Sequence, residues 1–232
     1  MFINIKDARK HYGEGETLVN ALDGVSLSLN EGRIYVILGP SGSGKSTLLN
    51  MIGGLDSLDS GEITIADRNI SGSDKKKLID YRREDVGFVF QFYNLIPDLT
   101  VQENIEVVSD ISKNPLDIEE VMTALDIEKY RNRFPKELSG GQQQRAAIAR
   151  ALIKNPKILL CDELTGALDS KSSRSVLKFI EKINEQFKTT IIIKTHNEAI
   201  ADMADSVIRI KDGRIADYTE NSHKLSAEEL AL

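Results

Sequence analysis

One glycine-rich segment constrains the fold of this chain more than any other feature. Residues 39–46 have the sequence GPSGSGKS and match the pattern G-x-x-x-x-G-K-[ST] without a mismatch. An apolar run rich in β-branched residues, 34–38, precedes them, and residues 46–53 have a helical pattern. Glycines let such a loop curl so that several backbone N–H groups point at one phosphate, and the helix that follows adds the positive end of its dipole. The segment therefore predicts a phosphate-binding loop between a strand and a helix.

The side chains of this loop suit a nucleotide and its metal ion. Lys45 is expected to place a mobile positive charge at the β- and γ-phosphates, and the Ser46 hydroxyl to ligate Mg²⁺. A flexible glycine turn is the alternative, and the match over eight residues in this setting disfavours it. The residues expected to contact the phosphates are Gly39, Pro40, Ser41, Gly42, Ser43, Gly44, Lys45, Ser46 and Thr47.

Three more apolar runs predict further strands of the same sheet. Residues 86–90, 158–161 and 190–193 are short and apolar, as are strands buried on both faces of a parallel sheet. Residues 170–187 are amphipathic over a longer stretch and predict a covering helix. The sequence therefore predicts an α/β fold with a mostly parallel sheet.

The N-terminal part of the chain has a different pattern. Residues 2–5, 18–29 and 61–65 are short alternating runs separated by turn residues. Antiparallel strands have this pattern, because one face is buried and the other is solvated. We therefore expect an N-terminal antiparallel β-subdomain.

The remaining segments complete the predicted organisation. Residues 100–134 are mostly helical in pattern, which indicates a helical insertion subdomain at about 92–145. Residues from about 220 to 232 predict a loose tail or a short helix. We expect a single domain over 1–219 followed by this C-terminal tail.

An acidic pair, Asp162 and Glu163, directly follows the run at 158–161. Ligands bind at the carboxyl ends of parallel strands, so Asp162 is expected to face the Mg²⁺ held at Ser46. Glu163 would point elsewhere and polarise an attacking water. A solvated strand end also carries such pairs, but the phosphate loop upstream favours metal-assisted phosphoryl transfer.

Residues 138–142 have the sequence LSGGQ, and with this segment the chain resembles the ATPase subunits of ABC transporters. Further motifs follow the family's order over about residues 2–217. The resemblance implies a P-loop NTPase core, ATP and Mg²⁺ as cofactors, and ATP hydrolysis as the activity. The residues that match the other motifs are Tyr12, Gln91, Ala167, Leu168, Asp169 and His196.

The resemblance also implies a role for each matched residue. Tyr12 is expected to stack on adenine, and His196 to contact the γ-phosphate and the attacking water. A half-exposed aromatic residue, a strand-end cap and a surface histidine are the plainer alternatives for Tyr12, Gln91 and His196. The implied catalytic residues are Glu163, His196, Gln91 and Lys45. The implied metal ligands are Ser46, Gln91 and Asp162.

The signature segment is itself a second candidate anion site. Ser139, Gly140, Gly141 and Gln142 open a helix, and a hydroxyl with glycine N–H groups at a helix N-terminus favours an anion. The chain then carries two half-sites on opposite sides of the helical insertion. The resemblance to ABC transporter ATPases implies that two copies pack head to tail around two ATP molecules, with each signature closing on the partner's γ-phosphate, and two half-sites suit this arrangement.

Two residues depart from the family's pattern. Leu164 follows the acidic pair where proline is usual, which restores a backbone N–H and frees φ at that turn. Lys194 stands where small or apolar residues are more usual. Neither change removes a catalytic group.

Finer resemblance indicates the branch. Residues 50–56, 81–97 and 195–197 are similar to the macrolide-exporter and lipoprotein-release branch, whose members serve membrane permeases. This implies export or extrusion of an antimicrobial peptide, drug, lipoprotein or similar cargo. An apolar cluster has two interpretations, a dock for a permease helix or a cover for the helical core. Its members are Phe92, Tyr93, Leu95 and Ile96.

Composition bears on the partners. The formal net charge is −6 and the pI about 5.3, which disfavours a nucleic-acid partner. No window approaches 18 consecutive apolar residues, and because no long apolar stretch follows the first charged residues we expect no secretory signal. We expect a peripheral protein on the cytoplasmic face of the cell membrane, in contact with the membrane only through the permease. The alternative is a soluble ABC ATPase acting on ribosomes or DNA, which the absence of a long coiled coil disfavours.

Overall fold

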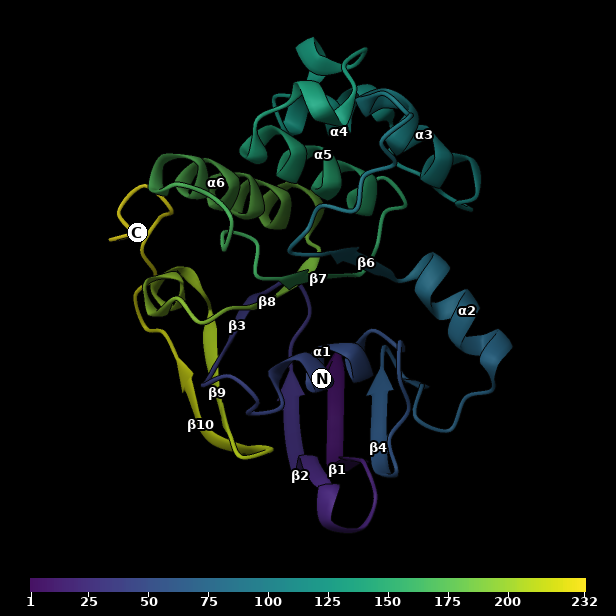
Figure 1. Cartoon of the computed structure of the whole chain (residues 1–232), viewed down its shortest axis with the longest axis vertical. Helices are drawn as coiled ribbons and strands as arrows, with labels where there is room; N and C mark the ends of the chain where they lie inside the picture. Colours follow the sequence, from purple (N-terminus) through teal and green to yellow (C-terminus); the bar gives the residue numbers. More distant parts are fainter.

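The apolar runs of the sequence form a six-stranded sheet at the centre of the molecule. The computed structural model describes residues 1–232, and the sheet has the order β10-β9-β3-β8-β7-β6 (Figure 1). From β9 to β6 all neighbours are parallel, and only β10 is antiparallel. In sheet order the strands are Arg214–Glu220, Ser206–Lys211, Ile34–Leu38, Thr190–Lys194, Ile158–Asp162 and Val86–Val89.

The central strands are buried on both faces. In β3, Val36 and Leu38 belong to one hydrophobic cluster, whereas Tyr35 and Ile37 belong to the other. Side chains alternate in this way because successive residues of a strand point to opposite faces. A continuous apolar sequence is thus required, which is why these strands were predictable.

Helices lie on one side of this sheet in two layers. Helices α5 (Gly140–Leu152) and α6 (Ser170–Phe187) pack against the strands, and α3 (Val101–Asp110) and α4 (Ile118–Ala124) lie beyond them (Figure 1). Helix α5 packs against the other three. No helix combines the length and the apolar character that crossing a bilayer requires.

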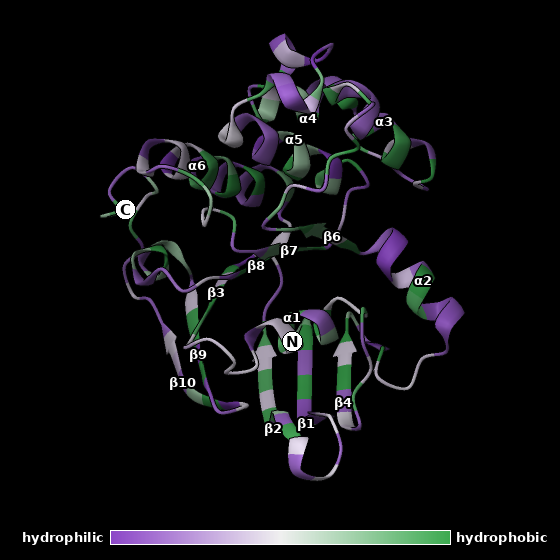
Figure 2. Cartoon of the chain, in the orientation of Figure 1, coloured by the Kyte–Doolittle hydropathy of each residue, from purple (hydrophilic) through white to green (hydrophobic).

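The opposite face of the sheet is covered by α1 (Lys45–Ile52) and by a second sheet. That sheet is antiparallel, with the order β2-β1-β4-β5. Figure 2 shows apolar and polar residues alternating along β1, β2 and β4, as expected for strands with one buried face. Its strands are Val19–Leu29, Ile3–Tyr12, Ser60–Ile65 and Arg68–Asn69. The predicted α/β fold with an antiparallel N-terminal sheet is confirmed.

Helix α2 (Lys75–Glu84) leaves its lysines in solvent and buries Tyr81, whose hydroxyl donates a hydrogen bond of 2.7 Å to the Ile52 carbonyl. The lysines and Arg83 thus form a solvated face, whereas Arg82 is half-buried and donates a hydrogen bond of 2.6 Å to the Gly54 carbonyl. The hairpin of β9 and β10 was not expected from the sequence.

The end of the chain differs from the expected loose tail or short helix. Strand β10 continues to Glu220, and the residues after it form no helix. Ala227 and Leu230 are nevertheless buried against the helical side of the core. Their backbone is also held, because the Ala227 N–H donates to Glu181 and Arg174 donates to the Leu230 carbonyl. Apolar burial thus anchors a segment that has no regular secondary structure.

We expect Leu230→Ala to lower the free energy of unfolding by about 2 kcal/mol, because it empties a buried leucine site. Urea unfolding followed by circular dichroism measures this. Leu55→Ala is the matched control, since Leu55 is 47% exposed and its truncation should change stability by less than about 0.5 kcal/mol. Equal stability of the two variants would show that the tail does not dock.

Candidate functional site

The glycine loop connects the end of β3 to the start of α1. Its Lys45 side chain is buried, and Nζ donates hydrogen bonds of 2.6 Å to the Gly39 carbonyl and 2.7 Å to the Pro40 carbonyl. Burial lowers the pKa of Lys45, and the nearby Lys194 ammonium lowers it further. The carbonyls of the loop itself thus hold the Lys45 ammonium.

The same loop contains an unsatisfied polar atom. The Ser43 hydroxyl oxygen is buried and has no hydrogen-bond partner in the protein. Buried hydroxyl groups are normally paired, so such an orphan indicates a place where a ligand supplies the partner. Beside a buried lysine at a helix N-terminus, that ligand is expected to be an anion.

The acidic pair lies at the carboxyl end of β7, next to β8 (Lys194 is its last residue). Asp162 Oδ1 is 2.6 Å from Lys194 Nζ. Glu163 is only 7% exposed, and its Oε1 is 3.1 Å from His196 Nδ1. Its other oxygen lies 3.4 Å from the Thr195 hydroxyl. The structure thus brings the predicted residues Glu163 and His196 into direct contact.

The loop and the acidic pair occupy the same edge of the sheet. Strand β8 lies between β3 and β7 and is parallel to both, so their carboxyl ends meet there. The pKa of Lys45 is lowered by burial and by Lys194, and the nearby carboxylates of Glu163 and Asp162 partly offset this lowering. Gln91 lies in the same region, because its Nε2 is close to Gly166 in the turn after β7. A Cβ atom built on Gly166 would be 3.5 Å from that nitrogen.

The donor set near the loop suits Mg²⁺. Ser46, Gln91 and Asp162 offer hydroxyl, amide and carboxylate oxygens, which are the hard ligands that this ion prefers. No group of three or more His, Cys, Asp and Glu residues forms a metal cage. Mg²⁺ is usually held by one or two carboxylates together with substrate phosphates, so it does not require such a cage.

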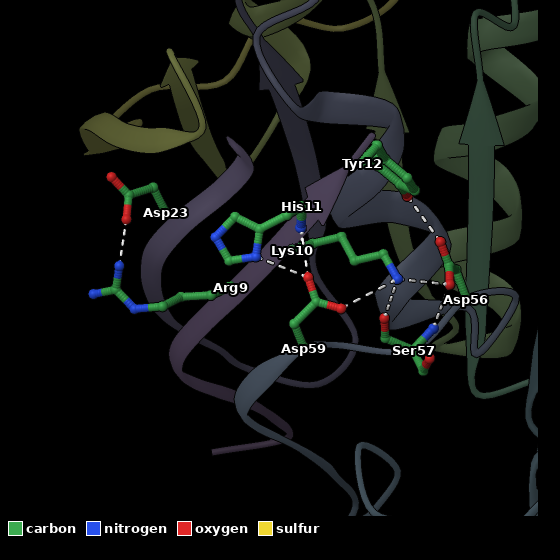
Figure 3. A network of polar contacts seen from close by, with 8 residues as sticks. All are labelled: Arg9, Lys10, His11, Tyr12, Asp23, Asp56, Ser57 and Asp59. Atoms are coloured by element: carbon green, nitrogen blue, oxygen red, sulfur yellow. Dashed lines mark hydrogen bonds and ion pairs between the residues drawn. The ribbon is translucent and has the colours of Figure 1, made fainter. Parts of the chain in front are cut away.

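Tyr12 ends β1 beside the loop that follows α1. Figure 3 shows its hydroxyl directed at Asp56, and the hydrogen bond measures 2.8 Å. Asp56 also accepts a hydrogen bond of 3.2 Å from Lys10. Burial and then the Asp56 carboxylate raise the pKa of Tyr12. Tyr12 is 42% exposed, and Lys10 Nζ lies over its ring at 5.2 Å from the centroid, so a stacking partner could reach only the other face of the ring.

Further polar contacts in Figure 3 hold the end of β1 against the loop that follows α1. His11 Nδ1 lies 2.9 Å from Asp59 Oδ2, and the His11 backbone N–H donates to the same oxygen. Asp56 and Asp59 lie in a loop outside any periodic pattern, so these contacts could not be predicted from the sequence.

The signature segment starts helix α5 as predicted. Ser139 is the N-cap, and its hydroxyl accepts from the Gln142 N–H at 3.4 Å while Gln142 Oε1 accepts from the Ser139 N–H at 2.9 Å. Asp169 caps α6 in the same manner. An open cavity of about 390 Å³ lies between the two helix starts. It is lined by Ser139, Gly141, Gln142, Arg145, Asp169, Lys171, Ser172 and Ser175.

Within one chain the two candidate anion sites are not joined. No hydrogen bond or ion pair links residues 139–142 to residues 39–47. Arg150 of α5 instead links the signature helix to the segment after Gln91. It donates hydrogen bonds of 2.6 Å to the Asn94 carbonyl and 3.1 Å to the Tyr93 carbonyl. Both Tyr93 and Asn94 have left-handed backbone conformations, which Arg150 helps to hold. The sequence did not reveal this role of Arg150.

Comparison with known proteins identifies the family. Residues 22–166 match the family described as ABC transporter. The chain is 44% identical over 220 residues to the putative ABC transporter ATP-binding protein MG467 homolog of Mycoplasma pneumoniae, covering 93% of this chain and 65% of that protein. It is 41% identical over 231 residues to the macrolide export ATP-binding/permease protein MacB of Hyphomonas neptunium, covering 97% of this chain and 36% of that protein.

A solved structure agrees with the fold. The ATP-binding cassette MJ0796 of Methanocaldococcus jannaschii, described as dimeric and bound to ADP and Pi in a post-hydrolysis state, superposes with a TM-score of 0.84 at 39% identity. The match covers 94% of this chain and 98% of that one. The family assignment made from the motifs is confirmed: this chain belongs to the ATP-binding proteins of the ABC transporter family.

Proposed function

We propose that this chain is the ATP-binding and ATP-hydrolysing subunit of a membrane exporter. One observation carries the proposal: the glycine loop, with its buried lysine and orphaned Ser43 hydroxyl, shares a sheet edge with two carboxylates. The first half binds phosphates, and the second supplies acid–base and metal-ligand chemistry.

In the proposed reaction, Glu163 orients the attacking water and accepts its proton. The contact of 3.1 Å between Glu163 Oε1 and His196 Nδ1 aligns the carboxylate, and the imidazole reaches toward the γ-phosphate. Lys45 leaves the Gly39 and Pro40 carbonyls to neutralise the phosphate oxygens. Mg²⁺, held by Ser46, Gln91 and Asp162, would neutralise charge on the β- and γ-phosphates. Tyr12 stacks on adenine.

Hydrolysis requires two copies of the chain in this proposal. Ser139, Gly141 and Gln142 line a cavity, and residues 139–142 make no hydrogen bond to the phosphate loop of their own chain. A second copy placed head to tail would bring them onto the γ-phosphate. The solved relative MJ0796 is described as dimeric and bound to ADP and Pi, which supports this arrangement.

The proposed membrane partner is a separate permease that exports a drug, peptide or lipoprotein. MacB is an export protein with its own permease part, and this chain resembles its ATP-binding part. Phe92 is 75% exposed and Ile96 41% exposed beside Gln91, so they offer an apolar dock. Leu95 instead packs against the helical core. The subunit would sit at the cytoplasmic face of the membrane through this contact, and co-purification of a permease from membranes tests it.

We expect Glu163→Gln to bind ATP normally, to lower turnover at least about 100-fold, and to accumulate as a dimer, because the amide cannot accept the proton of water. Phosphate release and size-exclusion chromatography with ATP measure these effects. Glu31→Gln, an exposed glutamate outside the site, is the control and should behave as the unaltered chain. Normal turnover of Glu163→Gln would exclude Glu163 as the base.

We expect Gly44→Ala to reduce ATP affinity at least about tenfold. Gly44 has φ +105°, and a Cβ there would stand 2.3 Å from the Ala21 carbonyl oxygen, so the loop must shift. Isothermal titration calorimetry measures the affinity. Gly72→Ala is the matched control, since a Cβ at Gly72 meets no atom within 4 Å. Equal affinity in both variants would contradict the phosphate-loop assignment.

A further inference from the structure

Lys194 enters the proposed nucleotide site from the carboxyl end of β8. Its Nζ lies 2.6 Å from Asp162 Oδ1 and 3.9 Å from Glu163 Oε1. In the parallel register of β7 and β8, Lys194 is the direct partner of Asp162. The pairing of two central strands therefore places this cation beside the acidic pair.

The surroundings of this ion pair are partly shielded from water. The Lys194 side chain is 14% exposed and that of Asp162 is 28% exposed. The positive charge of Lys194 also acts on Lys45, because after burial it is the next cause that lowers the pKa of Lys45. Lys45 and Lys194 thus place two ammonium groups near the two carboxylates Asp162 and Glu163.

This arrangement conflicts with the expected use of Asp162 as a metal ligand. The ion pair occupies Oδ1, one of the two Asp162 oxygens that could receive a divalent cation, and two positive charges at one carboxylate repel each other. Lys194 must therefore release Oδ1 before Asp162 can accept a cation at that oxygen. We propose that Lys194 is a positioning residue that holds Asp162 and competes at it with the divalent cation accompanying ATP.

This proposal rests on the proposed function and adds a consequence for nucleotide binding. After its release, the Lys194 ammonium remains at the end of β8, where it faces the same site as Lys45. It then supplies positive charge to a nucleotide that arrives without a metal ion. Lys194 is thus expected to favour metal-free nucleotide and to reduce the additional affinity that Mg²⁺ provides.

The ratio of two dissociation constants tests this consequence. Isothermal titration calorimetry with the non-hydrolysable analogue AMP-PNP gives one constant in EDTA and the other in millimolar Mg²⁺. We expect the ratio of the EDTA constant to the Mg²⁺ constant to rise about five- to tenfold in Lys194→Met. That is the effect of removing one partly shielded charge pair. The measurement reads binding and does not depend on turnover.

Two further variants separate charge from structure. Lys194→Arg keeps the positive charge and should retain nearly the ratio of the unaltered chain. Lys6→Met removes an exposed charge from β1, outside the site, and should leave the ratio unchanged. If Lys194→Met does not fold, Lys194→Gln provides the same comparison with a polar side chain.

The outcomes distinguish this proposal from the function on which it rests. A ratio in Lys194→Met and Lys194→Gln equal to that of the unaltered chain, with normal nucleotide binding, would overturn the role of Lys194 alone. If the unaltered chain bound no AMP-PNP in either buffer, the proposed function would fail, and this inference with it. A raised ratio in the neutral variants, together with an unchanged one in Lys194→Arg, would support it.

Discussion

The parallel pairing of β3, β8 and β7 is the constraint on which the candidate site depends. Lys194 is the register partner of Ile37 on one side and of Asp162 on the other. The last residues of β7 and β8 and the penultimate residue of β3 therefore lie in one row. A slip of one residue would turn every side chain of a strand to the opposite face of the sheet. The strand register thus sets the geometry of the charges.

The site places charged side chains next to the hydrophobic core. Such an arrangement is stable only if each charged group has a hydrogen-bond or ion-pair partner. Glu163 is nearly buried and contacts both His196 and Thr195. A buried charge without hydrogen-bond partners is costly, so these two contacts stabilise the Glu163 carboxylate in its place. Lys45 already donates a hydrogen bond to the Gly39 carbonyl. A nucleotide phosphate that binds Lys45 would therefore replace an existing hydrogen-bond partner of the ammonium group.

The sequence predicted the features that depend on periodicity or on a complete motif. The central strands, the glycine loop and the helix Ser170–Phe187 are examples, and the last was predicted with the same ends that the structure has. Patterns of burial repeat along the chain, so they are visible in a single sequence. The contacts between Tyr12 and Asp56 and between Asp162 and Lys194 were not predictable, because each depends on register or loop path between residues distant in sequence. The docking of Leu230 was missed for a similar reason: one buried side chain in an irregular segment has no period.

The turn after β7 shows how a departure from the family's pattern can be accommodated. Glu163 has φ +53°, a left-handed conformation that costs a non-glycine residue about 1–2 kcal/mol. Its N–H donates to the Lys194 carbonyl, and its carbonyl accepts from the Gly166 N–H. Leu164 stands where the family usually has proline, and it is only 2% exposed within the helical side of the core. Burial of a leucine contributes about 1.5–3 kcal/mol, enough to offset that strain. Burial of Leu164 can therefore fix the turn that presents Glu163. Proline at this position would fix the turn in another way, by restricting φ.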